Sequence, residues 1–244
     1  MTTLKTLAVH EVVQRTFPRP PPEEKDLVAM AIGAAIDGTL AQFGHEYRGG
    51  RRPTATSLRA RGAELLDERL EESAVSLPAT ERERLLGQLA DVIQAYRKSE
   101  ILGLARPRTH VLVLNGEVGV YAQPDYWDGR TRFYEMKSYP AIPPPPDVAL
   151  QLRMFQLAFP TYEAVLICIN RHVTPAATTR AVIPRPTPEE ADEALRRAYA
   201  LGREFGQPKV LEYMQGPFVH YDLPATGADR PTGNEAVSGN GADD

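Results

Sequence analysis

The chain has 244 residues, of which 42% are hydrophobic and 25% are charged, so it can bury a core of ordinary globular composition. Its formal net charge of −4 excludes a protein that is basic throughout, so any surface for nucleic acid has to be a local patch. The single cysteine, Cys168, excludes a disulfide framework within the chain and an all-cysteine metal site. It lies in an apolar run and is predicted to be a buried small hydrophobe.

The N-terminal part gives no sign of a membrane protein. No apolar run approaches the roughly 20 residues that span a bilayer, and the apolar stretch of a signal peptide is missing. We therefore expect a soluble, cytoplasmic protein with no membrane partner. Residues 1–22 are predicted to be an N-terminal segment that ends in a Pro-rich connector, because proline fixes φ and restricts the residue before it.

A first long helix is predicted over residues 23–43. Its apolar stripe follows helical spacing and consists of Ile32, Ile36, Leu40 and Phe43. Asp37 lies beside that stripe, on a face paved with Gly and Ala. An acid in this place is either exposed to solvent or directed at a positive group.

The densest positive stretch is residues 48–61, RGGRRPTATSLRAR, with five arginines and no acid. These side chains are predicted to contact phosphates, where each neutralised phosphate also releases counterions. The alternative is a solvated basic loop. The candidates for DNA binding are Arg48, Arg51, Arg52, Arg59 and Arg61.

Two further helices are predicted over residues 57–76 and 80–102, after which the pattern changes to the period of strands. Residues 109–114 and 118–125 form strands around a strong Asn115-Gly116 hairpin turn. A second tight turn, Asp128-Gly129, follows within residues 118–139. These signals predict three consecutive antiparallel strands.

The last two of these strands carry a compact polar group. Glu135 and Lys137 share one face of a strand, because successive side chains point to opposite faces, and the hairpin brings Asp125 back beside them. Two acids this close repel each other, and a divalent cation between them relieves the repulsion.

The next helix, residues 148–159, follows a rigid proline spacer and is predicted to begin at an Asp147 N-cap. Gln151 lies in its apolar stripe, in line with Met154 and Phe155. A buried amide costs on the order of 1–3 kcal/mol unless it is hydrogen-bonded. Gln151 therefore bonds either to a functional group or to the backbone where helix and sheet meet.

The rest of the chain is predicted to complete an α/β domain over residues 23–221. Residues 162–170 read as a strand buried on both faces, residues 178–183 as another strand, and residues 187–205 as a capped helix. Residues 207–221 are a last packed segment. Residues 222–244 lack clustered apolar side chains and are predicted to be a disordered tail.

Three linked features resemble the PD-(D/E)XK nuclease superfamily in its RecB-like branch. They are Pro124-Asp125 with Glu135-x-Lys137, the helix IGAAIDGTLAQF before it, and Gln151-x-x-x-Phe155 after it. Here Asp37 stands where the family has a metal-binding histidine, and Phe155 stands for a tyrosine. The iron–sulfur cysteines of some relatives are missing. The resemblance implies a restriction-endonuclease-like α/β sandwich with a central mixed sheet and an antiparallel meander.

The resemblance also implies roles for the residues. Asp125 and Glu135 ligate Mg²⁺ or Mn²⁺, with Asp37 and the Met136 carbonyl as further ligands. Lys137 orients or deprotonates the attacking water. Gln151 orients the substrate or the site. Four aromatic side chains lie near the site, where they either stack on bases or belong to the core: Tyr126, Trp127, Tyr134 and Tyr139.

The predicted function is metal-dependent hydrolysis of DNA phosphodiester bonds by an exonuclease of repair, recombination or mobile-element and phage DNA processing. A separate helicase or recombination protein is a possible partner. One alternative is a nuclease fold kept for DNA binding or assembly without cleavage. A second is an unrelated α/β protein in which the acids and the lysine form a surface salt bridge.

Overall fold

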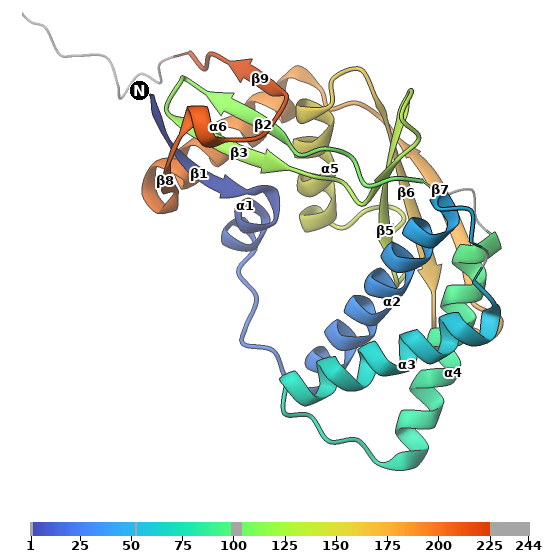
Figure 1. The fold of residues 1–244 in the computed structure, drawn as a ribbon. Helices are drawn as coiled ribbons and strands as arrows, with labels where there is room; N and C mark the ends of the chain where they lie inside the picture. The colour runs from blue at the N-terminus through green and yellow to red at the C-terminus, as the bar shows by residue number, and fades with distance from the viewer. Residues whose placement is uncertain (1, 52, 99–103, 225–244) are drawn as a thin grey trace, which may run out of the picture.

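The computed structural model describes residues 2–51, 53–98 and 104–224 (Figure 1). Within these residues the chain forms six α-helices and two mixed β-sheets, which confirms the α/β class. The predicted disordered tail lies outside the described residues, except for residues 222–224.

The first sheet has five strands in the order β8 (Gln207–Val210), β1 (Thr3–Ala8), β3 (Val118–Ala122), β2 (His110–Leu114) and β9 (Phe218–Tyr221). The hairpin between β2 and β3 turns at Asn115 and Gly116, whose φ angles of 51° and 66° are those of the predicted turn. β1 pairs in parallel with β3. The predicted N-terminal segment therefore supplies an inner strand of the same sheet as β2 and β3.

The second sheet has four strands in the order β4 (Tyr126–Trp127), β5 (Arg132–Lys137), β6 (Glu163–Asn170) and β7 (Ala177–Ile183). The predicted three-stranded meander is wrong, because β3 belongs to the first sheet and β4 pairs with β5 in the second. Between them lies Pro124, which has no N–H to donate to a ladder, so the chain changes sheets there. The single central sheet of the prediction is thus two sheets.

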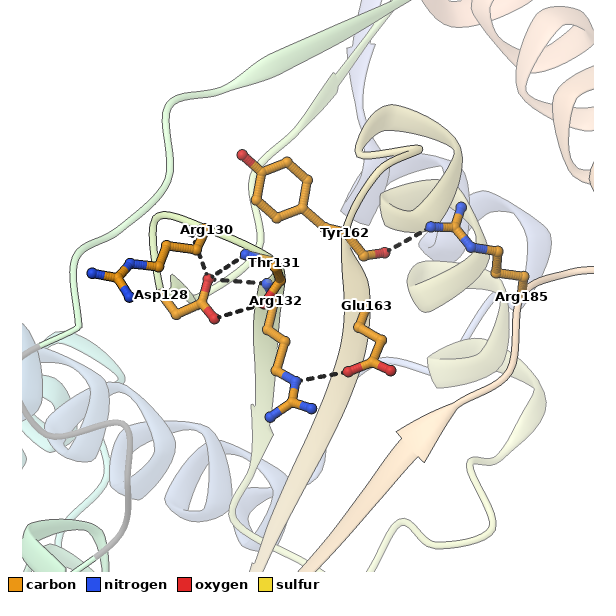
Figure 2. A network of polar contacts seen from close by, with 7 residues as sticks. All are labelled: Asp128, Arg130, Thr131, Arg132, Tyr162, Glu163 and Arg185. Carbon is orange, nitrogen blue, oxygen red and sulfur yellow. Dashed lines mark hydrogen bonds and ion pairs between the residues drawn. The ribbon is translucent and has the colours of Figure 1, made fainter.

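The turn between β4 and β5 is held by the Asp128 side chain, as Figure 2 shows. Its Oδ1 accepts hydrogen bonds from the backbone N–H groups of Arg130, Thr131 and Arg132 at 2.8, 2.8 and 3.0 Å. Slight burial opposes the charge of this carboxylate, but the backbone donors outweigh it and lower the pKa of Asp128. The sequence signal Asp128-Gly129 therefore gives the predicted turn, with Gly129 at φ 73°.

Helices cover the four-stranded sheet on both faces. α5 (Pro146–Ala158) packs on the face that carries Phe133, in a hydrophobic cluster that also includes α1 (Val9–Thr16) and α6 (Pro188–Phe205). α2 (Glu24–Arg48), α3 (Ala55–Glu72) and α4 (Ala79–Lys98) cover the face that carries Tyr134. Figure 1 shows these three helices gathered away from the five-stranded sheet. The predicted Asp147 N-cap is wrong, because α5 begins two residues earlier, with Pro145 as its N-cap and Asp147 in its first turn.

α2 is longer than predicted and ends at Arg48. By length and composition alone it could cross a membrane, so the expectation that no segment meets this test is wrong. A core helix meets the same test, and α2 packs against α3 and α4 through Ile32, Ile36 and Phe43. Its apolar character is accounted for by this packing. A 3₁₀ turn, η1 (Leu211–Tyr213), and β9 complete the described chain.

Candidate functional site

The centre of the candidate site is a buried ion pair on β5. The Lys137 Nζ donates to Glu135 Oε1 at 2.7 Å. The Glu135 side chain is 4% exposed and that of Lys137 is 17% exposed. Both point to the same side of β5 as Phe133, as the two-residue period of a strand predicts. The pair is buried, so Glu135 and Lys137 do not form a salt bridge on the surface.

Gln151 joins this pair from α5. Its Oε1 accepts a hydrogen bond from the Lys137 Nζ at 3.1 Å. The amide in the apolar stripe of the helix is thus satisfied by a charged donor, which resolves the choice left open by the sequence. One turn further on, Phe155 is buried and meets the Phe133 ring edge-on, with centroids 6.1 Å apart. Phe155 therefore belongs to the core beneath the polar group.

Asp125 lies immediately before β4, where the hairpin returns the chain to β5. Its Oδ2 accepts a hydrogen bond from the Met136 backbone N–H at 2.8 Å. Burial and then the neighbouring Glu135 carboxylate raise the pKa of Asp125 well above its usual value, against the opposing effects of Lys137 and the Met136 N–H. The structure therefore places the Glu135 carboxylate close enough to disfavour the charged form of Asp125.

The charge of Lys137 is set by the same neighbours. Burial opposes the ammonium charge, but the attraction and hydrogen bond of Glu135 outweigh it, with help from Asp125. The pKa of Lys137 is consequently raised. This lysine is held firmly in its charged form.

Asp37 on α2 has a different partner from the one predicted. Both of its carboxylate oxygens accept from Nη2 of Arg106, at 2.7 and 2.8 Å. The two side chains are each 47% exposed. The Asp37 charge contributes to the raised pKa of Asp125, so Asp37 lies within electrostatic reach of the central pair. Sequence reasoning missed Arg106, because it lies in an irregular segment that no periodic pattern marks.

The donor set fits a divalent cation only in part. Asp125 and Glu135 offer hard oxygen donors whose mutual repulsion a cation relieves. Of the two further predicted ligands, Asp37 is paired with Arg106. The contact that joins Met136 to Asp125 is made by the Met136 N–H, which is a donor and cannot bind a cation. Over residues 2–51, 53–98 and 104–224, no group of three or more His, Cys, Asp or Glu side chains is arranged to hold a metal ion.

The predicted DNA-binding arginines lie on the end of α2, in the loop after it and on α3. Arg48 donates to the Leu104 carbonyl at 2.8 Å, and Arg61 pairs with Glu64 at 3.0 Å. Arg51 and Arg59 are exposed, and Arg52 lies outside the described residues. The structure gives Arg48 and Arg61 contacts within the protein, and no hydrogen bond joins either of them to the polar group on β5 within the described residues.

The aromatic candidates divide into two sets. Tyr126 and Tyr134 are buried in the helical cluster, and half-buried Trp127 packs against Tyr162 at 5.8 Å. These three are core residues. Tyr139 is 38% exposed, and burial of its other part raises its pKa. Of the four, Tyr139 remains accessible for stacking on a base.

A cavity of about 320 Å³ lies elsewhere, between α5 and α6. Two ion pairs border it, Arg153 with Glu190 and Arg197 with Glu193. Glu135 and Lys137 are not among its lining residues, so this cavity and the polar group are separate features.

Comparisons with known proteins add little. No family model matches the sequence, and no curated protein matches it. Among solved structures, the crystal structure of SSO0001 matches at 12% identity and a TM-score of 0.35, over 82% of this chain and 84% of that chain. A likeness at this level carries no argument about the site.

Proposed function

We propose that this protein is a metal-dependent deoxyribonuclease of the RecB-like branch of the PD-(D/E)XK superfamily, acting as an exonuclease on DNA. The observation that carries the proposal is the meeting of Asp125, Glu135, Lys137 and Gln151 at the end of β5. These residues come from a loop, a strand and a helix. Buried charge of this kind is costly and is typical of functional sites.

The two carboxylates are the proposed cation ligands. Asp125 and Glu135 would hold Mg²⁺ or Mn²⁺, with the Met136 carbonyl and Asp37 as further candidates. A bound cation of this kind lowers the pKa of a water and neutralises charge on a scissile phosphate. Asp37 could join only after its contact with Arg106 has opened, because both of its oxygens are engaged.

Lys137 is proposed to orient the attacking water and to balance the charge that develops on the phosphate. Its raised pKa favours these roles over that of a base, since a lysine held in its charged form does not take up a proton. Gln151 fixes the direction of the Lys137 side chain through its 3.1 Å hydrogen bond. In this scheme Gln151 is a positioning residue.

The proposed fold follows from the same resemblance. Helix α2, the polar hairpin, helix α5 and the buried strand β6 occur in the order that a restriction-endonuclease-like sandwich requires. We extend the proposal to biological context: repair, recombination or the processing of mobile-element and phage DNA, with a helicase or recombination protein as a possible separate partner.

A second function is favoured by one observation. The Arg106 contact occupies Asp37, and the described residues offer no ready-made group of three metal-binding side chains. A protein that uses this fold to bind DNA or to assemble, without cleaving DNA, would not need a third metal-binding side chain.

Cleavage assays separate the two functions. Labelled single- and double-stranded DNA is incubated with the protein in Mn²⁺, Mg²⁺ or EDTA, beside Glu135→Gln and Lys137→Ala. The matched control is Glu163→Gln, which removes the same charge from the exposed Arg132–Glu163 pair at the other end of the strands (Figure 2). We expect cation-dependent cleavage that both site variants reduce at least about 100-fold and the control leaves intact. Binding without cleavage in every condition supports the second function.

Calorimetry of Mn²⁺ binding tests the ligand set without activity. We expect Glu135→Gln to weaken binding at least about tenfold, and Asp37→Asn by less than about threefold, because Asp37 is already engaged by Arg106. Equal losses in the two variants would show that Asp37 leaves Arg106 and coordinates the ion.

A further inference from the structure

Arg171 lies at the same edge of the four-stranded sheet as Lys137. β5 and β6 are parallel, with Lys137 opposite Cys168, so both strands end toward the same side. Ser138 directly follows β5, and Arg171 directly follows β6. The Arg171 Nη1 donates to the Ser138 Oγ at 3.5 Å, which is a long contact. In open α/β sheets, ligands bind outside the carboxyl ends of parallel strands, which is where these two residues lie.

Arg171 is a partly buried cation that forms no ion pair with any of the described residues. Its Nε is buried and has no hydrogen-bond partner within residues 2–51, 53–98 and 104–224. Burial and the charge of Arg84 both lower the pKa of Arg171, and no carboxylate offsets them. Arg84 in turn forms an ion pair with Glu81 at 2.5 Å. An arginine cannot shed its proton to escape this situation.

A buried unpaired donor on a charged group calls for an explanation, because native structures satisfy nearly all such groups. The planar guanidinium fork of arginine matches a phosphate, to which it can donate two parallel hydrogen bonds. A hydroxyl such as that of Ser138 is a second donor of the kind found at phosphate oxygens. An anion bound at the partly exposed guanidinium would therefore supply the counter-charge that Arg171 lacks.

We propose that Arg171 and Ser138 form an anion subsite that binds a backbone phosphate of the nucleic acid, next to the phosphate that the proposed function would place at Lys137. This inference rests on the proposed function for its substrate class. It places the strand along the carboxyl ends of β5 and β6. It also explains how a chain with a net charge of −4 can hold a polyanion through a local contact.

The test is nucleic-acid binding in EDTA, where neither cation nor cleavage contributes. A fluorescent 12-nucleotide single strand and a duplex of the same sequence are titrated at several salt concentrations. The variants are Arg171→Gln, the charge-conserving Arg171→Lys, and the matched control Arg130→Gln. Arg130 is exposed and lies in the turn at the opposite end of β5, where Figure 2 shows its side chain directed away from the strands.

We expect Arg171→Gln to weaken binding of at least one of the two DNAs about five- to tenfold and to lower the slope of its salt dependence by about one. Arg171→Lys should recover part of this loss, and Arg130→Gln should stay within about twofold of the wild type. Equal affinity and equal slope in the wild type and Arg171→Gln would overturn the inference, as would a wild type that binds neither DNA.

Thermal unfolding gives a second readout that needs no DNA. Inorganic phosphate is added at constant ionic strength, and the rise in Tm is compared between wild type and Arg171→Gln. A larger rise in the wild type supports an anion site at Arg171, and an equal rise contradicts it. A rise with phosphate but unchanged DNA affinity would mean that the site takes a free phosphate, and would overturn the nucleic-acid part of the inference.

The two proposals fail in different ways. If the wild type binds DNA through Arg171 but never cleaves it, the nuclease proposal fails and the subsite stands. If the wild type cleaves DNA and Arg171→Gln matches it in affinity and in KM, the subsite fails and the nuclease proposal stands.

Discussion

Helix α5 packs against both the five-stranded and the four-stranded sheet, but the two sheets differ in whether they bury charged side chains. Two inner strands of the five-stranded sheet, β3 and β2, bury an almost wholly apolar set, including Val111, Leu112, Leu114, Val118 and Val120. The four-stranded sheet is covered by helices on both faces, yet β5 buries Glu135 and most of Lys137. The better covered sheet therefore carries the buried charges.

This difference separates two uses of a strand. Apolar strands contribute to stability through burial, at roughly 25 cal/mol per Å² of apolar surface. The charged end of β5 gains no such contribution, and it loses the hydration of its ions. Retaining charges there is consistent with selection for chemistry over stability. The predictions below test this division, beginning with the largest expected effect.

The first prediction removes the cation that balances the buried carboxylates. Lys137→Met leaves Asp125 and Glu135 facing each other without an ammonium, so we expect a loss of about 3–5 kcal/mol in the free energy of unfolding. Urea unfolding monitored by circular dichroism measures this loss. In the double variant with Glu135→Gln, most of the stability should return. A single variant as stable as the wild type would contradict the view that this pair is buried and electrostatically coupled.

The second prediction addresses the apolar packing beside the five-stranded sheet. At Gly202 of α6, an added Cβ would lie 2.2 Å from Val118 Cγ1 and 3.1 Å from Leu7 Cδ2. We expect Gly202→Ala to destabilise the protein by about 1–3 kcal/mol through overpacking.

The matched control is Gly87→Ala on α4, where a Cβ would meet nothing within 4 Å. Alanine has the better helix propensity, so this change should stabilise by up to about 1 kcal/mol. Thermal melts of the two variants should shift in opposite directions. An increase in melting temperature for both variants would mean that the side chains around Gly202 move to make room for the added methyl group.

The third and smallest effect concerns His110 of β2. Its Nδ1 lies 2.7 Å from the Ala158 carbonyl and its ring stacks on Phe159 at 3.8 Å. Burial lowers the pKa of His110, against the opposing effect of that carbonyl. The unfolded chain then binds a proton at higher pH than the folded protein. His110 therefore favours the folded state above a pH of about 6.5, which is the pKa of histidine in the unfolded chain. This contribution to the free energy of unfolding is lost as the pH falls below that value.

Melting temperatures between pH 5 and 8 measure this effect. We expect His110→Gln to show a shallower decline toward pH 5 than the wild type. The comparison at pH 8, where the imidazole is neutral in both states, isolates the loss of the stacked ring. Parallel curves of melting temperature against pH for the two proteins would contradict a lowered pKa of His110.

Much of the local structure follows from the sequence alone. The Asn115-Gly116 turn and Gly129 of the second turn follow from the positive φ angles that these residue types adopt easily. Glu135 and Lys137 share a face because a strand has a period of two, and Gln151 is exceptional because it breaks an apolar stripe. The prediction that Cys168 is buried is confirmed.

Other features were decided by the tertiary structure. The pattern of residues 109–137 does not show that its strands separate into two sheets, because pairing partners are chosen by the whole fold. Asp37 meets Arg106 across 69 positions of sequence, and Arg171 meets Ser138 across 33. Sequence periodicity reports which way a side chain points within its own element. Which charge it faces there depends on how distant elements pack.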